Sequence, residues 1–469
     1  MPASPSVIIL LADGARPDVL SAAMRSGELP ALAQLCAEGS LRTITTVFPS
    51  VTGPAYAPFL MGRHPGSVGL PGLRWYDRAH SACTWPSYAR SYIGPQCRFL
   101  DADLSADADT IFELAKPSIG ALSVIRRGLP ARARIGSGAL FVARTGITHF
   151  RGKVSGWLDI DRNVADDFVT RVRDERPRYA FAAFTGIDKA SHALGHDAPL
   201  VHDAMRIVDE ACARIRADAE RTGSWSQTHL WIVSDHGHSR VSAHEHLAGF
   251  VASLGLRVVA HPWTVRPRAQ VAVAVSGNAM AHLYTGLESR TRQFWPALAA
   301  RWGGVADAIL ERDSVDIMLL PLSPTSCEVR SRETGSAVVS WSGHTYSYHP
   351  RSGDPLGIGE HDCLDETRAF DVTVEGNYPD AIVQIARLAS CSRSGDIILS
   401  AASEWDFRAR YEPISHISSH GALHREHMLV PLITNQPIQG TARRTVDVMA
   451  SACAALSVTA ARGEGQSFL

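Results

Sequence analysis

Short apolar runs alternate with amphipathic segments along the chain, and polar residues follow several of these runs directly. The clearest run, Ser6–Ala12, is continuously apolar and begins with β-branched residues, which is typical of a buried parallel strand. Similar runs occur at Tyr179–Thr185 and His229–Val233, and helical spacing marks Leu200–Arg221 between them. This alternation predicts an α/β fold with a doubly wound, mostly parallel sheet and helices on both faces.

The alternation is interrupted twice, which indicates insertions into one core. Turns and aromatic residues replace the regular pattern at about 63–151, and strands follow in no clear α/β order at about 241–394. We therefore expect one core across residues 1–469, with both insertions forming a cap that shapes substrate access. Gly395–Ser400 and Met428–Ile433 are expected to return the chain to the core sheet.

Composition limits the partners that the chain can have. The 46 basic and 47 acidic side chains give a net charge of -1, so no field of the whole molecule attracts nucleic acid or an anionic membrane. The run Val7–Ala12 is too short for a signal peptide, and no later run approaches the ~18 residues of a membrane helix. We expect a cytoplasmic protein with no membrane segment and no nucleic-acid-binding signature, and the oligomeric state stays open.

Residues with ligand chemistry follow the predicted strands. They are Asp13, Thr52, Asp188, His192, Asp235, His236 and His420. The carboxyl ends of parallel strands meet at one edge of a sheet, where ligands bind. Carboxylates, imidazoles and a hydroxyl are suitable ligands for two divalent ions, zinc foremost, with Mn²⁺ as an alternative. Asp188 and His192 are four residues apart and can reach one ion from a helical turn, whereas the adjacent Asp235 and His236 can serve one ion or two.

The turn at Thr52 joins an apolar run to a short expected helix. Pro54 suits the first helical position and Gly62 the end, which places Thr52 at a helix N-terminus, where free N–H groups favour phosphate. A Thr N-cap is the simpler interpretation of this turn alone. Beside six other ligand residues, the hydroxyl would instead bind an ion, lose its proton and act as the nucleophile. Two ions ~4 Å apart would stabilise the attacking and leaving oxygens of an in-line displacement.

Five motifs occur in a fixed order along the chain. They are Asp13-Gly-x-Arg-Pro-Asp, Thr52-x-Pro54, Asp188-x-x-x-His192-x-x-Gly195, Ser234-Asp235-His236-Gly237 and His420-Gly421. In this order they resemble the metal-site motifs of the alkaline phosphatase superfamily, and most closely its type I phosphodiesterase and nucleotide pyrophosphatase branch. The resemblance covers about 6–61, 179–237 and 395–456 and implies an alkaline phosphatase-like core.

The resemblance also implies two zinc ions and a role for each ligand. One ion would be held by Asp13, Thr52, Asp235 and His236, and the other by Asp188, His192 and His420. Thr52 would attack phosphorus and form a phospho-threonine intermediate, which activated water would then hydrolyse.

Two positions depart from the nucleotide-cleaving members of that branch. Those members continue Thr-Phe-Pro-Asn, whereas this chain has Ala55 in place of the Asn, and a second phosphate-contacting Asn of the branch falls on Leu73. Neighbouring Arg74 offers a charged donor in its place, which would favour a more anionic group such as a monoester. We therefore expect Arg74 to contact the substrate.

The expected function is metal-dependent hydrolysis of a small-molecule phosphate ester, either a diester or a monoester. Two alternatives stay open: a phosphonate C–P hydrolase, which uses the same metal core in related proteins, and a metal-binding relative without activity. The intact ligand set disfavours the inactive relative. A sulfatase is a weaker interpretation, because those relatives need a Cys or Ser at the position of Thr52. These residues do not identify the natural leaving group.

Overall fold

A seven-stranded sheet forms the centre of the computed structural model, which describes residues 4–78, 89–262, 265–408 and 415–469. Its strand order is β2-β21-β8-β1-β7-β5-β6. Strands β8, β1, β7, β5 and β6 are parallel, whereas β21 runs antiparallel to both of its neighbours. The strands are β1 (Ser6–Ala12), β2 (Ser40–Thr45), β5 (Ser118–Ala121), β6 (Arg134–Ile135), β7 (Tyr179–Phe184), β8 (Thr228–Val233) and β21 (Leu429–Thr434). The predicted mostly parallel α/β sheet is confirmed.

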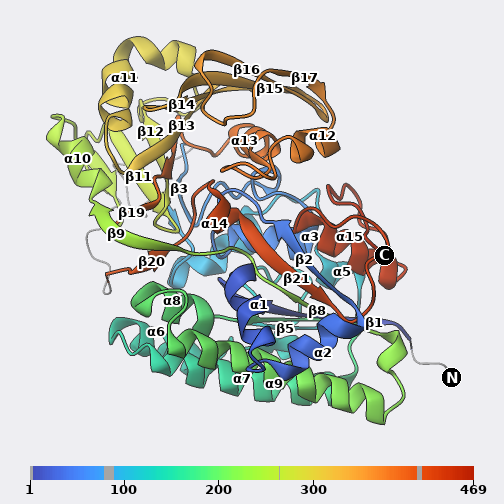
Figure 1. Ribbon diagram of the computed structural model, residues 1–469. Helices are drawn as coiled ribbons and strands as arrows, with labels where there is room; N and C mark the ends of the chain where they lie inside the picture. The colour runs from blue at the N-terminus through green and yellow to red at the C-terminus, as the bar shows by residue number, and fades with distance from the viewer. Residues whose placement is uncertain (1–3, 79–88, 263–264, 409–414) are drawn as a thin grey trace.

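Helices cover both faces of this sheet because the side chains of β1 alternate between two apolar cores (Figure 1). Val7, Ile9 and Leu11 pack on one face with α3, α5 and α15. The intervening side chains pack on the other face with α1, α2, α7, α8 and α9. The bounds are α1 (Pro17–Arg25), α2 (Pro30–Glu38), α3 (Ala57–Met61), α5 (Ile111–Leu114), α7 (Ser155–Glu175), α8 (Gly186–Leu194), α9 (Pro199–Arg221) and α15 (Val446–Ala455).

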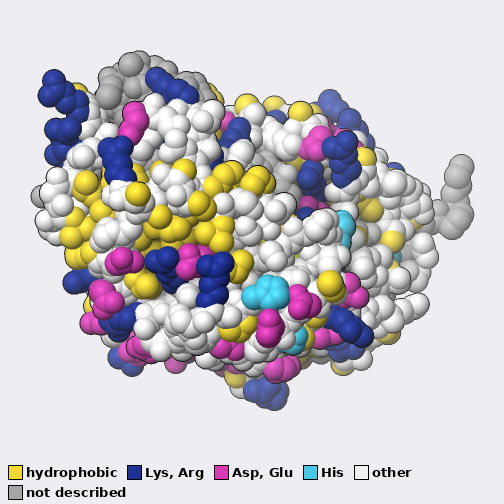
Figure 2. Space-filling model, turned by 90° about the horizontal axis from the view of Figure 1, so that it is seen from above, with side chains coloured by type: hydrophobic (Ala, Val, Ile, Leu, Met, Phe, Trp, Pro, Cys, Tyr) yellow, Lys and Arg dark blue, Asp and Glu magenta, His cyan; other side chains and the backbone are white. Residues whose placement is uncertain are grey.

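A second, nine-stranded sheet lies above the core in Figure 1, with the order β10-β11-β12-β18-β13-β14-β15-β16-β17. Its strands are β10 (Val258–Ala260), β11 (Val271–Ser276), β12 (Met280–Thr285), β13 (Val315–Ser323), β14 (Ser326–Ser331), β15 (Gly335–Ser342), β16 (Thr345–Gly353), β17 (His361–Leu364) and β18 (Ile397–Ala401). Helices α10 (Leu247–Ser253), α11 (Trp295–Leu310), α12 (Glu366–Asp371) and α13 (Ala381–Ala389) accompany it. In the view from above, hydrophobic side chains gather between charged ones on the surface (Figure 2).

Two segments belong to different sheets from those expected. The segment 63–151, predicted to be an insertion, supplies β5 and β6 to the core sheet; its residues 79–88 lie outside the described part of the chain. Strand β18, expected to return the chain to the core, instead pairs with β12 and β13 in the second sheet. An apolar run indicates a buried strand but not its pairing partner, which is decided by long-range contacts.

Smaller elements connect the layers. Strands β19 (Glu404–Phe407), β9 (Ser239–Glu245) and β20 (Ser418–Ser419) form a three-stranded sheet, and β3 (Arg74–Tyr76) pairs with β4 (Ala89–Ser91). Within the described residues, the remaining helices are α4 (Leu100–Asp103), α6 (Ala139–Phe150), α14 (Arg425–Met428) and five short 3₁₀ helices, of which η1 (Pro54–Tyr56) leads into α3. Among the helices of the described residues, none has the length and hydrophobicity to span a membrane.

Candidate active site

The turn before η1 directs the Thr52 hydroxyl into a buried polar cluster. Gly53 adopts a φ of 98° and makes the turn, and η1 and α3 follow to Gly62. The Thr52 side chain does not cap this helix, so the interpretation as an N-cap is wrong. Its Oγ1 lies 3.2 Å from Asp13 Oδ1 and 3.1 Å from His236 Nε2.

One group of ligand atoms collects at the ends of β1 and β8. Asp13 follows β1, and Asp235 and His236 follow β8. His236 Nε2 lies 3.4 Å from Asp13 Oδ1 and 3.5 Å from Asp235 Oδ2. All three side chains are buried, and their ligand atoms lie within 4.8 Å of one another. Tyr56 borders the group, with its hydroxyl 3.4 Å from Asp13 Oδ2.

A second group surrounds Asp188, which lies in the first turn of α8 directly after β7. Its Oδ1 lies 3.1 Å from His192 Nε2, one turn further along α8, and 3.5 Å from His420 Nε2, just after β20. Lys189 Nζ donates to Asp188 Oδ2 at 2.7 Å. The imidazole of His236 stacks on that of His420 with 3.5 Å between ring centroids. The structure therefore brings all seven predicted residues into one continuous cluster.

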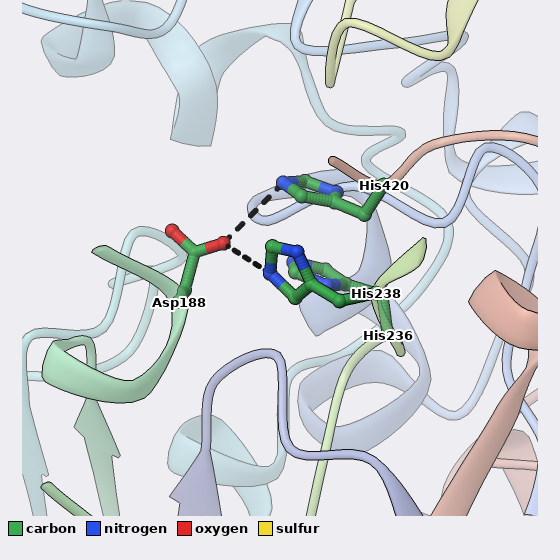
Figure 3. Close-up of side chains that lie close together, drawn as sticks. All are labelled: Asp188, His236, His238 and His420. Carbon is green, nitrogen blue, oxygen red and sulfur yellow. Dashed lines mark hydrogen bonds and ion pairs between the residues drawn. The ribbon is translucent and has the colours of Figure 1, made fainter. Parts of the chain in front are cut away.

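His238 belongs to this cluster although it was not among the predicted ligands. Its Nε2 lies 2.9 Å from Asp188 Oδ1, and Figure 3 shows how the two side chains face each other. The ring packs so tightly on Gly14 that a Cβ there would lie 2.9 Å from His238 Cδ2, and the φ of Gly14 is +76°. The alternation of His236 and His238 after a strand is the signal in the sequence that indicates a shared site. Gly14 is required by the close approach of this ring.

Three imidazoles point Nε2 at carboxylate oxygens, and in a neutral ring this nitrogen carries no proton. Nδ1 of His192, His236 and His420 lies 2.8–3.1 Å from the backbone carbonyl oxygens of Ser418, Gly237 and Ser50, respectively. A carbonyl oxygen only accepts, so each Nδ1 carries a proton, and in the neutral ring Nε2 presents a lone pair. These lone pairs face carboxylate oxygens at 3.1–3.5 Å. Two acceptors at this separation repel unless a proton or a metal cation lies between them.

Burial disfavours a second proton on most of these imidazoles, so a proton does not bridge most of these contacts. Burial lowers the pKa of His192, His238 and His420, the pKa of His238 to about 3, so these rings are neutral at physiological pH. At His236, burial also lowers the pKa, but the negative charge of Asp235 and the bond to Asp13 outweigh it and raise the pKa to about 9.

The carboxyl group of Asp235 also has too little positive charge around it to offset its burial. Burial and the charge of Asp13 hold the pKa of Asp235 well above its usual range, and Asp235 Oδ2 accepts no hydrogen bond from any described residue. A buried acceptor without a partner is costly. The donor set, the lone pairs and this oxygen all fit divalent cations.

A hydrogen-bonded carboxyl group holds the helix that carries Asp188 and His192. Asp161 of α7 is completely buried and accepts from the backbone N–H groups of Thr185 at 3.1 Å and Gly186 at 2.7 Å. These N–H groups begin α8 and have no partner within the helix. Burial raises the pKa of Asp161 to about 7, against the effect of the two hydrogen bonds.

Arg74 lines a cavity that is separate from this cluster. Its Nη1 is 3.4 Å from the carbonyl oxygen of Val275, and the preceding Leu73 lies beside Gly53, with Cδ1 3.4 Å from where a Cβ would be. The cavity has a volume of about 500 Å³ and is lined by Val258, Val273, Val275, Arg74, Arg266 and Arg408, among others. None of the described lining residues is acidic. The structure thus places Leu73 next to the Thr52 turn and the Arg74 side chain in an apolar and basic pocket.

The fold and the cluster define a class of protein, an α/β protein with buried carboxylates and imidazoles converging at the ends of parallel strands. The family model "Type I phosphodiesterase / nucleotide pyrophosphatase" matches residues 7–296. The chain therefore belongs to the type I phosphodiesterase/nucleotide pyrophosphatase family, within the alkaline phosphatase superfamily, as its motifs predict. The prediction that it is an enzyme of the phosphoric ester hydrolase class is confirmed.

Solved structures share this fold at low sequence identity. Phosphonoacetate hydrolase from Sinorhizobium meliloti 1021 in complex with phosphonoacetate has 16% identity and a TM-score of 0.55, with 97% of this chain and 96% of that chain covered. Human ectonucleotide pyrophosphatase/phosphodiesterase 5 has 14% identity and a TM-score of 0.56, with 99% and 97% covered. No curated protein sequence matches the chain. At these identities the structural likeness shows the fold alone.

Proposed function

We propose that the protein hydrolyses phosphate esters with Thr52 as the nucleophile and two divalent cations, zinc foremost, as cofactors. The supporting observation is that the neutral imidazoles of His192 and His420 point Nε2 at Asp188 Oδ1 across 3.1 and 3.5 Å, while Asp235 Oδ2 has no hydrogen-bond partner among the described residues. Asp13, Thr52, Asp235 and His236 would hold one cation, and Asp188, His192 and His420 the other. Bound cations would polarise the phosphoryl oxygens and lower the pKa of the Thr52 hydroxyl.

The proposed reaction has two steps, in which Thr52, Asp13 and Lys189 have different roles. Thr52 Oγ1 attacks phosphorus, the bond from phosphorus to the leaving oxygen breaks, and the leaving group departs with a proton. Water then attacks the phospho-threonine, the bond between Oγ1 and phosphorus breaks, and phosphate or a monoester is released. Asp13 orients the hydroxyl from 3.2 Å, and Lys189 adds positive charge beside Asp188.

The cavity at Arg74 is the proposed site of the leaving group. Its volume of about 500 Å³ accommodates an organic group, and Arg74, Arg266 and Arg408 favour one that carries an anion. Arg74 would contact the substrate from this cavity. Whether the ester is a monoester or a diester stays open, and the sequence-based prediction of a cytoplasmic location remains untested.

A phosphonate is the second candidate substrate. One structural neighbour is a phosphonoacetate hydrolase with a TM-score of 0.55, and phosphoryl transfer to Thr52 would break a C–P bond in place of a P–O bond, with the proton going to carbon. A panel of aryl monoesters, aryl diesters, nucleotide diphosphates and phosphonates, each assayed with zinc, separates these substrates.

Substitution of Thr52 tests the proposal directly. Thr52→Ala should abolish turnover and keep most of the metal, because one ligand of seven is lost, whereas Thr52→Ser should keep part of the activity because it retains the hydroxyl. Elemental analysis of both variants and of Asp235→Ala measures the metal. Full activity of Thr52→Ala, or metal content unaffected by Asp235→Ala, would overturn the assignment.

A further inference from the structure

Helix α6 (Ala139–Phe150) turns large apolar side chains toward solvent. None of its 12 residues, all within the described part of the chain, is buried. Leu140, Val142, Ile147 and Phe150 keep 89%, 60%, 54% and 79% of their surfaces exposed. Exposed apolar side chains gathered in one place mark a surface that contacts a partner or a membrane.

These side chains follow a helical stripe. Leu140, Ala143, Ile147 and Phe150 succeed one another at intervals of three, four and three residues, which places them along one face of α6. The rest of the protein holds the helix by its other side, where Phe141 packs against the core. The stripe is therefore directed away from the core.

The stripe is bordered by positive charge. Arg144 and Arg151 lie beside it and Lys153 follows, all three exposed. Between Glu113 and Asp159 the sequence contains eight Lys and Arg residues and no acidic residue. Arg144, Arg151 and Lys153 form no ion pair with any residue that the structure describes. The net charge of the whole chain is -1, so this segment is far more basic than the protein as a whole.

We propose that α6 docks the protein on an anionic membrane surface. The helix would lie parallel to the membrane, with its stripe among the first acyl carbons and its basic side chains at the headgroups, as amphipathic interfacial helices do. A second copy of the chain suits the helix less well, because symmetric pairing would bring Arg144 and Arg151 close to their own copies. The inference does not depend on the proposed function.

Contacts between side chains connect α6 to the buried cluster. The His149 ring of α6 lies 6.5 Å from the Trp157 ring, and Lys189 Nζ lies 5.9 Å from the same ring. Lys189 in turn donates to Asp188. Docking through α6 would therefore bring the cluster near the membrane surface.

Vesicle flotation with the full-length protein tests the proposal. The protein is mixed with vesicles of phosphatidylcholine alone or of phosphatidylcholine with phosphatidylglycerol, at low and high salt. We expect binding to the anionic vesicles, weakened by salt. Ile147→Ser with Phe150→Ser should lower partitioning at least about tenfold, because two large apolar side chains no longer insert. Arg144→Glu should lower it at least about fivefold, because charge attraction becomes repulsion.

Matched variants elsewhere on the surface serve as controls. Ile93→Ser removes an aliphatic side chain that is 49% exposed, and Arg221→Glu reverses an exposed charge at the end of α9; both should bind vesicles like the wild type. Thermal unfolding of every variant reports its folding, and turnover of an aryl phosphate should be unchanged by the α6 substitutions.

Three results would overturn the proposal. They are absence of binding to anionic vesicles, equal binding by the stripe variant and the wild type, and a dimer in light scattering that the stripe variant disrupts without any effect on vesicles. The last result would assign the stripe to a second copy of the chain.

Discussion

The buried carboxyl group of Asp161 should make the stability of the protein fall as the pH rises. Burial raises its pKa from 3.8 to about 7. Between these values the native state keeps a proton that the unfolded state has released, so raising the pH favours unfolding. Asp161→Asn removes this titration and keeps one oxygen that accepts from α8. The free energy of unfolding of the wild type should therefore decline relative to that of the variant as the pH rises through this range.

The size of the effect follows from the shift. A pKa raised from 3.8 to about 7 corresponds to a difference of about 4 kcal/mol between the two ends of the range. Solvent does not screen the charge of this carboxyl group, because Asp161 has no exposed surface. Above the native pKa both states are ionised and the difference becomes constant. The bonds from the first N–H groups of α8 favour the ionised form, so the cost comes from burying the charge and is relieved where local opening of α8 lets water reach Asp161.

Urea unfolding of both proteins across this pH range measures the difference, with Asp166→Asn as a matched control on the same helix, where the side chain is 70% exposed. Hydrogen exchange of peptides covering Thr185 and Gly186 provides a local readout. Parallel pH dependence of the wild type and Asp161→Asn would refute a protonated Asp161 in the native state.

Three further predictions concern single side chains. His238→Ala should weaken zinc binding by about ten- to hundredfold, because its ring contacts Asp188; titration with zinc measures this, and unchanged affinity would refute the role. Arg74→Ala should lower kcat/KM for monoesters by about tenfold or more and less for diesters; an equal kcat/KM in variant and wild type for both classes would refute substrate contact. Glu464→Gln should lower the thermal midpoint near neutral pH, because Glu464 accepts from His64 Nδ1 at 2.7 Å. Burial raises the pKa of Glu464, but the bond from His64 and nearby positive charge together outweigh burial, and the net pKa is lowered. This stabilisation is therefore present above the usual pKa of Glu and lost toward acid. A difference in thermal midpoint between variant and wild type that stays constant on acidification would contradict it.

The position of the cluster could be predicted because its information is local. Asp13 directly follows one apolar run and Asp235 lies one residue beyond another, and parallel strands place their ends at one edge. The spacing of Asp188 and His192 needs a single helical turn, which α8 provides. For these residues, short segments of sequence and a general rule of sheet topology are enough.

Sheet membership and side-chain direction could not be obtained in this way. The run that forms β18 is as apolar as a core strand, and its pairing with β12 and β13 depends on residues far away in the sequence. His238 contacts Asp188 because the chain turns after β8 and packs the ring against Gly14. The direction of Arg74 likewise depends on β11, whose Val275 carbonyl it contacts.

His420 gives the cluster a mechanical role between the two sheets. Its carbonyl oxygen accepts from Ala279 N at 3.1 Å, in the loop that joins β11 to β12 of the nine-stranded sheet. Its imidazole faces Asp188, which follows β7 of the core sheet. An ion bound by both residues would act as a cross-link between the two sheets, in addition to the apolar core that side chains of both sheets share. Loading the site would then strengthen the coupling between the unfolding of the two sheets.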